Sequence, residues 1–257
     1  MTEAWQLDTR LVGRRVEVHD CIPSTSDRAW ELAADPASDG LAVLAHEQTA
    51  GRGTQGRRWQ CPPGAGVLLS VILFPPPELR RAVILTALGA VAVCETIRTT
   101  ANLQARIKWP NDVLFGGKKV CGILTESKIV GGRFATVCGI GINVNQPLEA
   151  FTGPGLDQGT SLSIAAGRAF DTPRIARQLL HHLDDEYQRL LTGDVATLES
   201  VWKWRIGLLG RDVVAECSDG DRHGRLLELG WDGVELEAAD GVIRLRPEVV
   251  KHLRAPH

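Results

Sequence analysis

Residues 105–126, ARIKWPNDVLFGGKKVCGILTE, contain the pattern that decides the fold. Residues 105–109 predict a short strand that ends at a proline, and two further apolar segments, 113–115 and 119–126, lie on either side of Gly116-Gly117. A glycine pair between apolar strands supplies the backbone of a tight turn. The sequence therefore predicts a β-hairpin preceded by a third short strand.

Charged residues around this hairpin are candidates for a binding cleft. Lys108 closes the first strand and Lys119 opens the last one, so a hairpin can aim both ammonium groups into one cleft. The alternative is that Lys118 and Lys119 are solvated turn residues, as lysine pairs usually are. That alternative is stronger for Lys118.

The rest of the chain alternates between strand-like and helix-like segments. Further strands are predicted at residues 15–19, 41–46, 67–74 and 134–144, and helices at about 25–34, 78–100, 173–191 and 195–204. After about Gly207 short alternating segments are separated by Asp-Gly turns, which indicates a small antiparallel barrel. We therefore expect two domains, 1–207 and 208–257.

Composition excludes several classes of protein. The 257 residues carry 29 Lys and Arg against 31 Asp and Glu, a formal net charge of −2, so bulk charge does not support binding to nucleic acid. Six dispersed cysteines with no C-x-x-C pair argue against a metal finger or a disulfide framework. No signal segment and no apolar run of membrane-spanning length is visible. We expect a reduced, cytoplasmic protein that is not in a membrane.

Two glycine-containing segments add to the hairpin. Residues 51–59, GRGTQGRRW, combine glycines with three arginines and no acid, which suits close approach to phosphate or carboxylate. A flexible basic surface loop is an equally good interpretation of this segment alone. Gly139 and Gly141 interrupt a buried strand, which indicates either close approach of a ligand or tight packing of a helix.

Taken together, four motifs resemble the biotin protein ligases. They are Ser24-Thr25-Ser26, then residues 48–53 (QTAGRG), then 108–112 (KWPND) with 119–124 (KVCGIL), and finally 139–143 (GIGIN). The resemblance spans about residues 16–207. It implies an α+β fold in which helices cover a mixed β-sheet like that of class II aminoacyl-tRNA synthetases, followed by a small SH3-like barrel.

The resemblance also implies a reaction. Biotin is activated by ATP as biotinyl-5′-AMP, and a lysine of a biotin carboxyl carrier domain then takes the biotin and releases AMP. ATP and Mg²⁺ are the expected co-substrate and activator, with no tightly bound prosthetic group. The sister lipoate or octanoate transferases, a DNA-binding repressor and a non-catalytic biotin or nucleotide binder are the alternatives.

Site residues follow from the resemblance by position. The catalytic groups are Lys119 and Arg52. The biotin contacts are Ser24, Thr25, Ser26, Gln48, Gly51, Arg52, Gly53, Thr54, Lys119, Gly122, Gly139 and Gly141. The nucleotide contacts are Arg52, Arg57, Trp59, Lys108, Asn111, Lys119 and Asn143, and Asp112 is a candidate Mg²⁺ ligand.

Three departures from the family pattern qualify these expectations. Thr54 stands where some relatives carry an arginine that retains the adenylate, and residues 146–160 lack the tryptophan that some relatives stack on adenine. Only 23 residues precede Ser24, too few for the N-terminal DNA-binding domain of repressor members. We therefore expect no repressor activity and no nucleic-acid partner, while a monomer and a homodimer both stay open.

Overall fold

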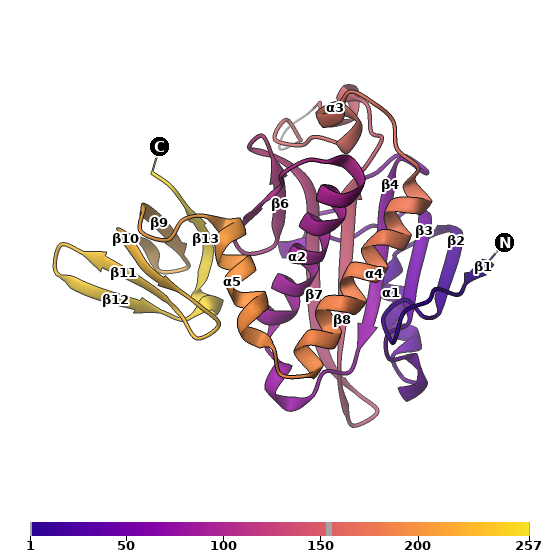
Figure 1. The fold of residues 1–257 in the computed structure, drawn as a ribbon, viewed down its shortest axis with the longest axis horizontal. Helices are drawn as coiled ribbons and strands as arrows, with labels where there is room; N and C mark the ends of the chain where they lie inside the picture. Colours follow the sequence, from indigo (N-terminus) through magenta and orange to yellow (C-terminus); the bar gives the residue numbers. More distant parts are fainter. Residues whose placement is uncertain (1, 153–155, 257) are drawn as a thin grey trace.

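The structure is a computed structural model that describes residues 2–152 and 156–256. Within them an eight-stranded sheet has the order β1-β2-β3-β4-β8-β7-β6-β5, in which β2 and β3 are parallel and the other neighbours are antiparallel. A second, five-stranded antiparallel sheet has the order β12-β11-β10-β9-β13. The two sheets lie on opposite sides of helix α5 (Figure 1).

The elements have the following bounds. The strands of the large sheet are β1 (Thr2–Trp5), β2 (Val16–Ile22), β3 (Ala42–Gln48), β4 (Gly66–Leu73), β5 (Arg106–Lys108), β6 (Asp112–Phe115), β7 (Lys118–Val130) and β8 (Arg133–Asn143). The helices are α1 (Thr25–Leu32), α2 (Ala82–Ala101), α3 (Leu162–Ala166), α4 (Thr172–Leu191) and α5 (Val195–Ile206). The second sheet contains β9 (Asp212–Cys217), β10 (Gly220–Leu229), β11 (Val234–Ala238), β12 (Gly241–Leu245) and β13 (Val250–Arg254).

Helices cover both faces of the large sheet. Helices α2 and α4 pack on one face, where the main apolar core forms, and α1 packs on β3, β4 and β8 from the other side (Figure 1). Strand β4 is buried along its whole length because both of its faces are covered, which explains its continuous apolar sequence. The predicted mixed sheet with helices is therefore confirmed.

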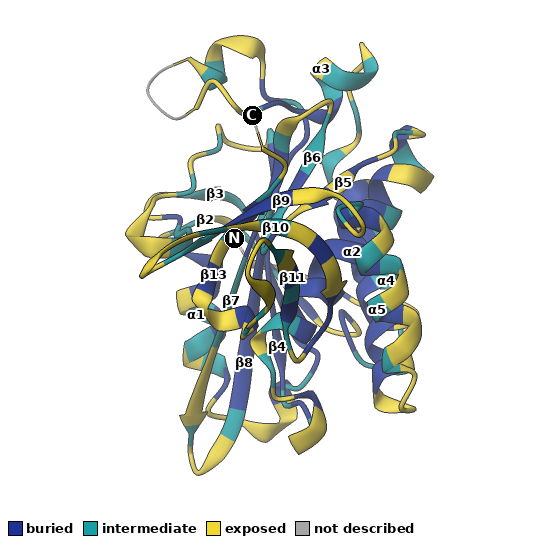
Figure 2. Cartoon of the chain, turned by 90° about the vertical axis from the view of Figure 1, so that its left-hand side faces the viewer, coloured by how far each residue is buried: buried dark blue, intermediate teal, exposed yellow. Residues whose placement is uncertain are grey.

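Helix α2 is apolar on nearly all sides. The expectation that no apolar run reaches membrane-spanning length is wrong, because the 20 residues of α2 are long and apolar enough to cross a membrane. However, 72% of that segment is buried inside the protein, as in the core helix of a globular domain. Figure 2 shows the same distribution, with buried residues along α2 and the middle of β8 and exposed residues at the tip of the β7–β8 hairpin.

The predicted hairpin around Gly116-Gly117 joins β6 to β7, and both glycines have positive φ, at 57° and 80°. Three short elements escaped prediction, namely β1, α3 and β13. Each has five residues or fewer, and no glycine pair or Asp-Gly turn marks its ends, unlike the predicted short strands β6 and β12.

An aromatic stack joins the two sheets. The ring centroids of Trp109 and Trp202 are 5.5 Å apart, and those of Trp202 and Trp231 are 4.8 Å apart. Trp109 Nε1 also donates a buried hydrogen bond of 2.8 Å to the carbonyl of Val250 in β13. The expected boundary near Gly207 separates the sheets, but one continuous apolar cluster crosses it.

Candidate active site

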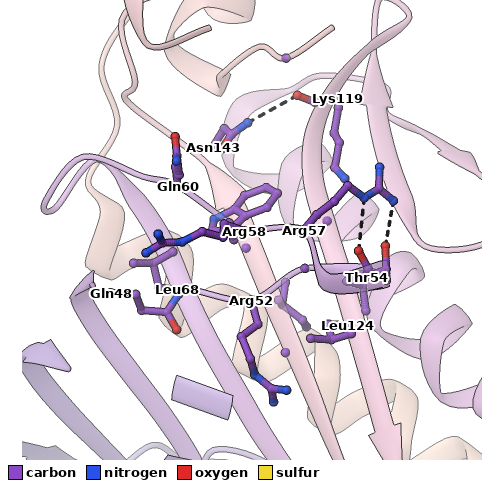
Figure 3. A pocket seen from close by; sticks show the side chains of 18 of the residues that line it. Gln48, Arg52, Thr54, Arg57, Arg58, Gln60, Leu68, Lys119, Leu124 and Asn143 are labelled. Carbon is purple, nitrogen blue, oxygen red and sulfur yellow. Dashed lines mark hydrogen bonds between the residues drawn. The ribbon is translucent and has the colours of Figure 1, made fainter. Parts of the chain in front are cut away.

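A cavity of about 520 Å³ opens where β4, β7 and β8 meet the loop after β3 and the loop after β8 (Figure 3). Most of the predicted site residues line it. They are Thr25, Ser26, Gln48, Arg52, Gly53, Thr54, Arg57, Trp59, Asn111, Lys119, Gly122, Gly139, Gly141 and Asn143. The structure thus brings together side chains from all four sequence motifs.

Glycines form the floor of the cavity. Gly122 of β7 pairs with Gly141 of β8, and the indole of Trp59 lies against both. A Cβ atom on Gly141 would lie 2.4 Å from Trp59 Cε2, and one on Gly122 would lie 2.9 Å from Trp59 Cζ3. Since real side chains do not approach so closely, a side chain at either position would displace the indole or fill the slot.

Hydroxyl groups and an amide form one end of the cavity. Ser70 Oγ lies 2.8 Å from Thr25 Oγ1 and 3.0 Å from Ser26 Oγ. The Thr25 hydroxyl and backbone N–H both donate to Gln48 Oε1, at 3.0 and 2.7 Å. Ser70 is fully buried and was missed by sequence reasoning, although a lone serine within VLLSVILF was the available signal.

Cationic groups gather toward the other end. Lys119 Nζ forms an ion pair of 2.6 Å with Asp112 and lies 5.7 Å from the ring centroid of Trp59. The Lys119 backbone is fixed from both sides, because its N–H donates to the carbonyl of Gln158 and its carbonyl accepts from the N–H of Thr160. Arg57 hydrogen-bonds to Thr54 beside the cavity (Figure 3).

Arg52 is predicted as a catalytic and nucleotide-binding residue, but its side chain pairs with two carboxylates of the protein. Its guanidinium donates to both oxygens of Glu126, at 3.1 and 2.5 Å, and its Nε lies 3.2 Å from Asp27. In Figure 3 this side chain points away from Lys119. Burial acts to raise the pKa of Glu126, but the hydrogen bonds from Arg52 and Trp30 bring that pKa below its ordinary value.

Two predicted nucleotide contacts are engaged by the protein itself. Asn143 is buried, donates to the carbonyl of Thr160 at 3.0 Å, and accepts from Gln146 Nε2 at 2.9 Å. Asn111 donates to the carbonyl of Ile123 at 2.8 Å. These amides hold the loops around the cavity in place.

Four predicted site residues do not line the cavity. Ser24 caps α1 by accepting a hydrogen bond from the N–H of Asp27. Gly51 packs under the carbonyl of Trp59, where a Cβ atom would lie 2.5 Å from that oxygen. The expectation that Lys108 shares one cleft with Lys119 is wrong, because β5 is the edge strand and Lys108 is exposed there.

The fourth is Asp112, the candidate Mg²⁺ ligand. Its carboxylate is paired with Lys119, and the described part of the chain contains no cluster of three or more His, Cys, Asp or Glu that could hold a metal. Asp112 is thus a single carboxylate beside Lys119, and its role as a Mg²⁺ ligand stays a prediction.

Several lining residues were not predicted. They are Arg58, Gln60, Leu68, Leu69, Ile123, Leu124, Ile140, Ala150, Phe151, Leu156, Gln158 and Gly159. Phe151 packs on Gly159, where a Cβ atom would lie 2.4 Å from Phe151 Cδ1. Most of the others are apolar strand or loop residues whose sequence does not distinguish them from ordinary core.

The geometry suits one kind of ligand. A slot floored by glycines and walled by leucine and isoleucine side chains has hydroxyls and an amide at one end and an ammonium group at the other. It can accept a molecule with a polar head, an apolar middle and an anionic end.

Comparisons with known proteins agree with this description. Residues 18–143 match the Biotin/lipoate A/B protein ligase family. The chain is 37% identical over 241 residues to the bifunctional ligase/repressor BirA of Bacillus subtilis, covering 93% of this chain and 74% of the relative. It is 33% identical over 251 residues to the biotin–[acetyl-CoA-carboxylase] ligase of Mycobacterium tuberculosis, covering 88% and 89%. The biotin protein ligase of Aquifex aeolicus in complex with biotin and ATP superimposes with a TM-score of 0.79 at 25% identity, covering 94% of this chain and 99% of that one.

Proposed function

The chain belongs to the biotin/lipoate A/B protein ligase family and is a biotin protein ligase, and from that premise we propose that it activates biotin as biotinyl-5′-AMP and transfers it to a lysine of a biotin carboxyl carrier domain. The observation that carries the proposal is the slot itself, with Lys119 at one end and Thr25, Ser26 and Gln48 at the other. The buried Ser70 hydroxyl contacts the hydroxyls of Thr25 and Ser26.

Biotin fits this slot by its chemistry. Its ureido ring needs paired donors and acceptors, which the hydroxyls of Thr25 and Ser26 and the amide of Gln48 supply. Its apolar chain lies on the glycine floor beside the Trp59 indole. The carboxylate at the end of that chain then reaches the ammonium group of Lys119.

In the first step a carboxylate oxygen attacks the α-phosphorus of ATP, the bond to the β-phosphate oxygen breaks, and pyrophosphate leaves. Two anions must approach each other, so the positive charge of Lys119 stabilises the transition state by reducing their repulsion. Asp112, 2.6 Å away, fixes the position of that ammonium group. We propose that Mg²⁺ arrives with the phosphates of ATP, as it commonly does in nucleotide sites.

In the second step the uncharged amine of a carrier lysine attacks the acyl carbon of the adenylate. The amide bond forms, the bond to the phosphate oxygen breaks, AMP leaves with the electron pair, and the amine loses a proton to solvent. Until then the loop of residues 48–66 shields the mixed anhydride from water. We propose that Phe151, an aromatic residue of the loop after β8 that lines the cavity, contacts adenine.

A competition experiment tests the proposal. The purified protein is incubated with ATP, Mg²⁺ and equal amounts of biotin, lipoate and octanoate, and the bound adenylate is identified by mass spectrometry. We expect biotinyl-AMP alone. Lipoyl- or octanoyl-AMP would assign the chain to the sister activity, and no adenylate would favour a non-catalytic binder. A cytoplasmic location and the lack of repressor activity stay predictions.

A further inference from the structure

Residues 51–59, hereafter the glycine-arginine loop, form a small hairpin. Its Arg52 side chain makes ion pairs with two residues outside the hairpin. Inside the hairpin, Arg52 and Arg58 form a β-bridge, the Gly53 N–H donates to the Arg57 carbonyl, and the Trp59 N–H donates to the Gly51 carbonyl. The hairpin therefore moves as a unit, and whatever holds Arg52 also determines where Trp59 lies.

The side chain of Arg52 connects this unit to two other elements. Glu126 in β7 receives two hydrogen bonds from the guanidinium, and Asp27 in α1 lies 3.2 Å from Nε. The side chains of Arg52 and Glu126 are 34% and 27% exposed, so water screens the pair only in part. Planar two-point pairing between guanidinium and carboxylate is also the most directional ion pair in proteins.

Glu126 is itself held in place. Trp30 Nε1 of α1 donates to Glu126 Oε2 at 3.3 Å, so the carboxylate has partners on both the loop and the helix. Its lowered pKa means that it is ionised at neutral pH. Strand β7 also carries Lys119 and Gly122, and the cluster thus fixes the loop relative to the strand that forms the reacting end of the slot.

We infer that Glu126, Asp27 and Arg52 form an anchor that positions the glycine-arginine loop, and that Arg52 is a positioning residue whose charge does not neutralise the reacting phosphate. The inference rests on the proposed function for its kinetic consequence. The anchor keeps Trp59 on the floor formed by Gly122 and Gly141, and so completes the wall of the biotin slot. Neutralisation at the phosphate then depends on Lys119.

A double-mutant cycle with E126Q, R52Q and the double variant tests the anchor. Both single variants should raise the KM for biotin about tenfold and leave kcat for adenylate formation within about threefold, because the wall of the slot is loosened while Lys119 stays in place. The double variant should be no worse than either single variant, since both remove the same contact. E31Q is the matched control, because Glu31 makes an exposed ion pair with Arg28 away from the cavity and should leave both constants unchanged.

A second measurement does not depend on activity. In the ligand-free protein, tryptic cleavage after Arg57 and Arg58 should be about tenfold faster in E126Q than in the wild type and unchanged in E31Q. If the wild type makes no adenylate, the proposed function fails, and this comparison still tests the anchor.

Two results would overturn the inference. One is cleavage of the loop in E126Q at the wild-type rate. The other is a large fall in kcat for R52Q while E126Q keeps the wild-type kcat and KM, which would assign the Arg52 charge to the reacting phosphate.

Discussion

Replacement of Gly141 by alanine should lower the free energy of unfolding and weaken biotin binding. The size of both effects follows from the contacts around Gly141. The new Cβ atom would lie 2.4 Å from Trp59 Cε2 and 2.6 Å from Nε1, whereas carbon atoms in contact are about 3.5–4.0 Å apart. The indole must therefore move by about 1 Å or more. The backbone at Gly141 is not in the left-handed region, so the cost is steric alone.

Forcing one extra carbon into a packed site costs about 1–3 kcal/mol, and we expect a loss of that size in the free energy of unfolding measured with urea. A methyl group on the floor should also weaken biotin binding by about 10–200-fold, measured by calorimetry. Gly89→Ala is the control, because Gly89 lies in α2 outside the cavity and its variant should bind biotin as the wild type does. If G141A has the same free energy of unfolding and the same affinity for biotin as the wild type, the slot is not where we place it.

Four other outcomes are expected. Lys119→Ala should keep the fold by circular dichroism and slow adenylate formation about 10²–10³-fold, whereas a near-normal rate would remove this lysine from the mechanism. Ser70→Ala should weaken biotin binding about tenfold in calorimetry, because the hydroxyls around it lose their shared partner. Trp109→Phe should lower the free energy of unfolding by about 1–3 kcal/mol, since the Val250 carbonyl would lose its 2.8 Å hydrogen bond. The folded-state pKa of Glu126 is lowered, so its stabilisation is complete above the ordinary glutamate pKa and is lost as the pH falls through the lowered value. The difference in urea midpoint between wild type and E126Q should therefore shrink below about pH 4.

Much of the fold could be predicted because its strands and helices carry strong periodic or continuous apolar patterns. The segment predicted as a buried strand at 67–74 is β4 (Gly66–Leu73), and the helix predicted at 173–191 is α4 (Thr172–Leu191). Three turns of the second sheet could be predicted because Asp-Gly pairs mark them. The short strands β1 and β13 have no such turn signal beside them, and so they did not stand out.

The site was harder to predict because side-chain direction depends on tertiary neighbours. Lys108 and Lys119 look alike in sequence, but an edge strand leaves the first exposed while the loop after β8 fixes the second at the cavity. Arg52 belongs to a motif of glycines and arginines, and only the placement of Glu126 in space shows that it has a carboxylate partner. Ser70 became recognisable once β4 was seen beside Thr25.

Transfer of biotin to a carrier lysine is tested best by the intact mass of a biotin carboxyl carrier domain. The domain is unmodified at the start and is weighed after incubation with the enzyme, biotin, ATP and Mg²⁺. We predict the mass increase of one biotin amide, and none when the acceptor lysine of the carrier is replaced by arginine. A carrier that stays unmodified while biotinyl-AMP accumulates would contradict the transfer step. Modification by lipoate or octanoate in place of biotin would contradict the assignment of the substrate.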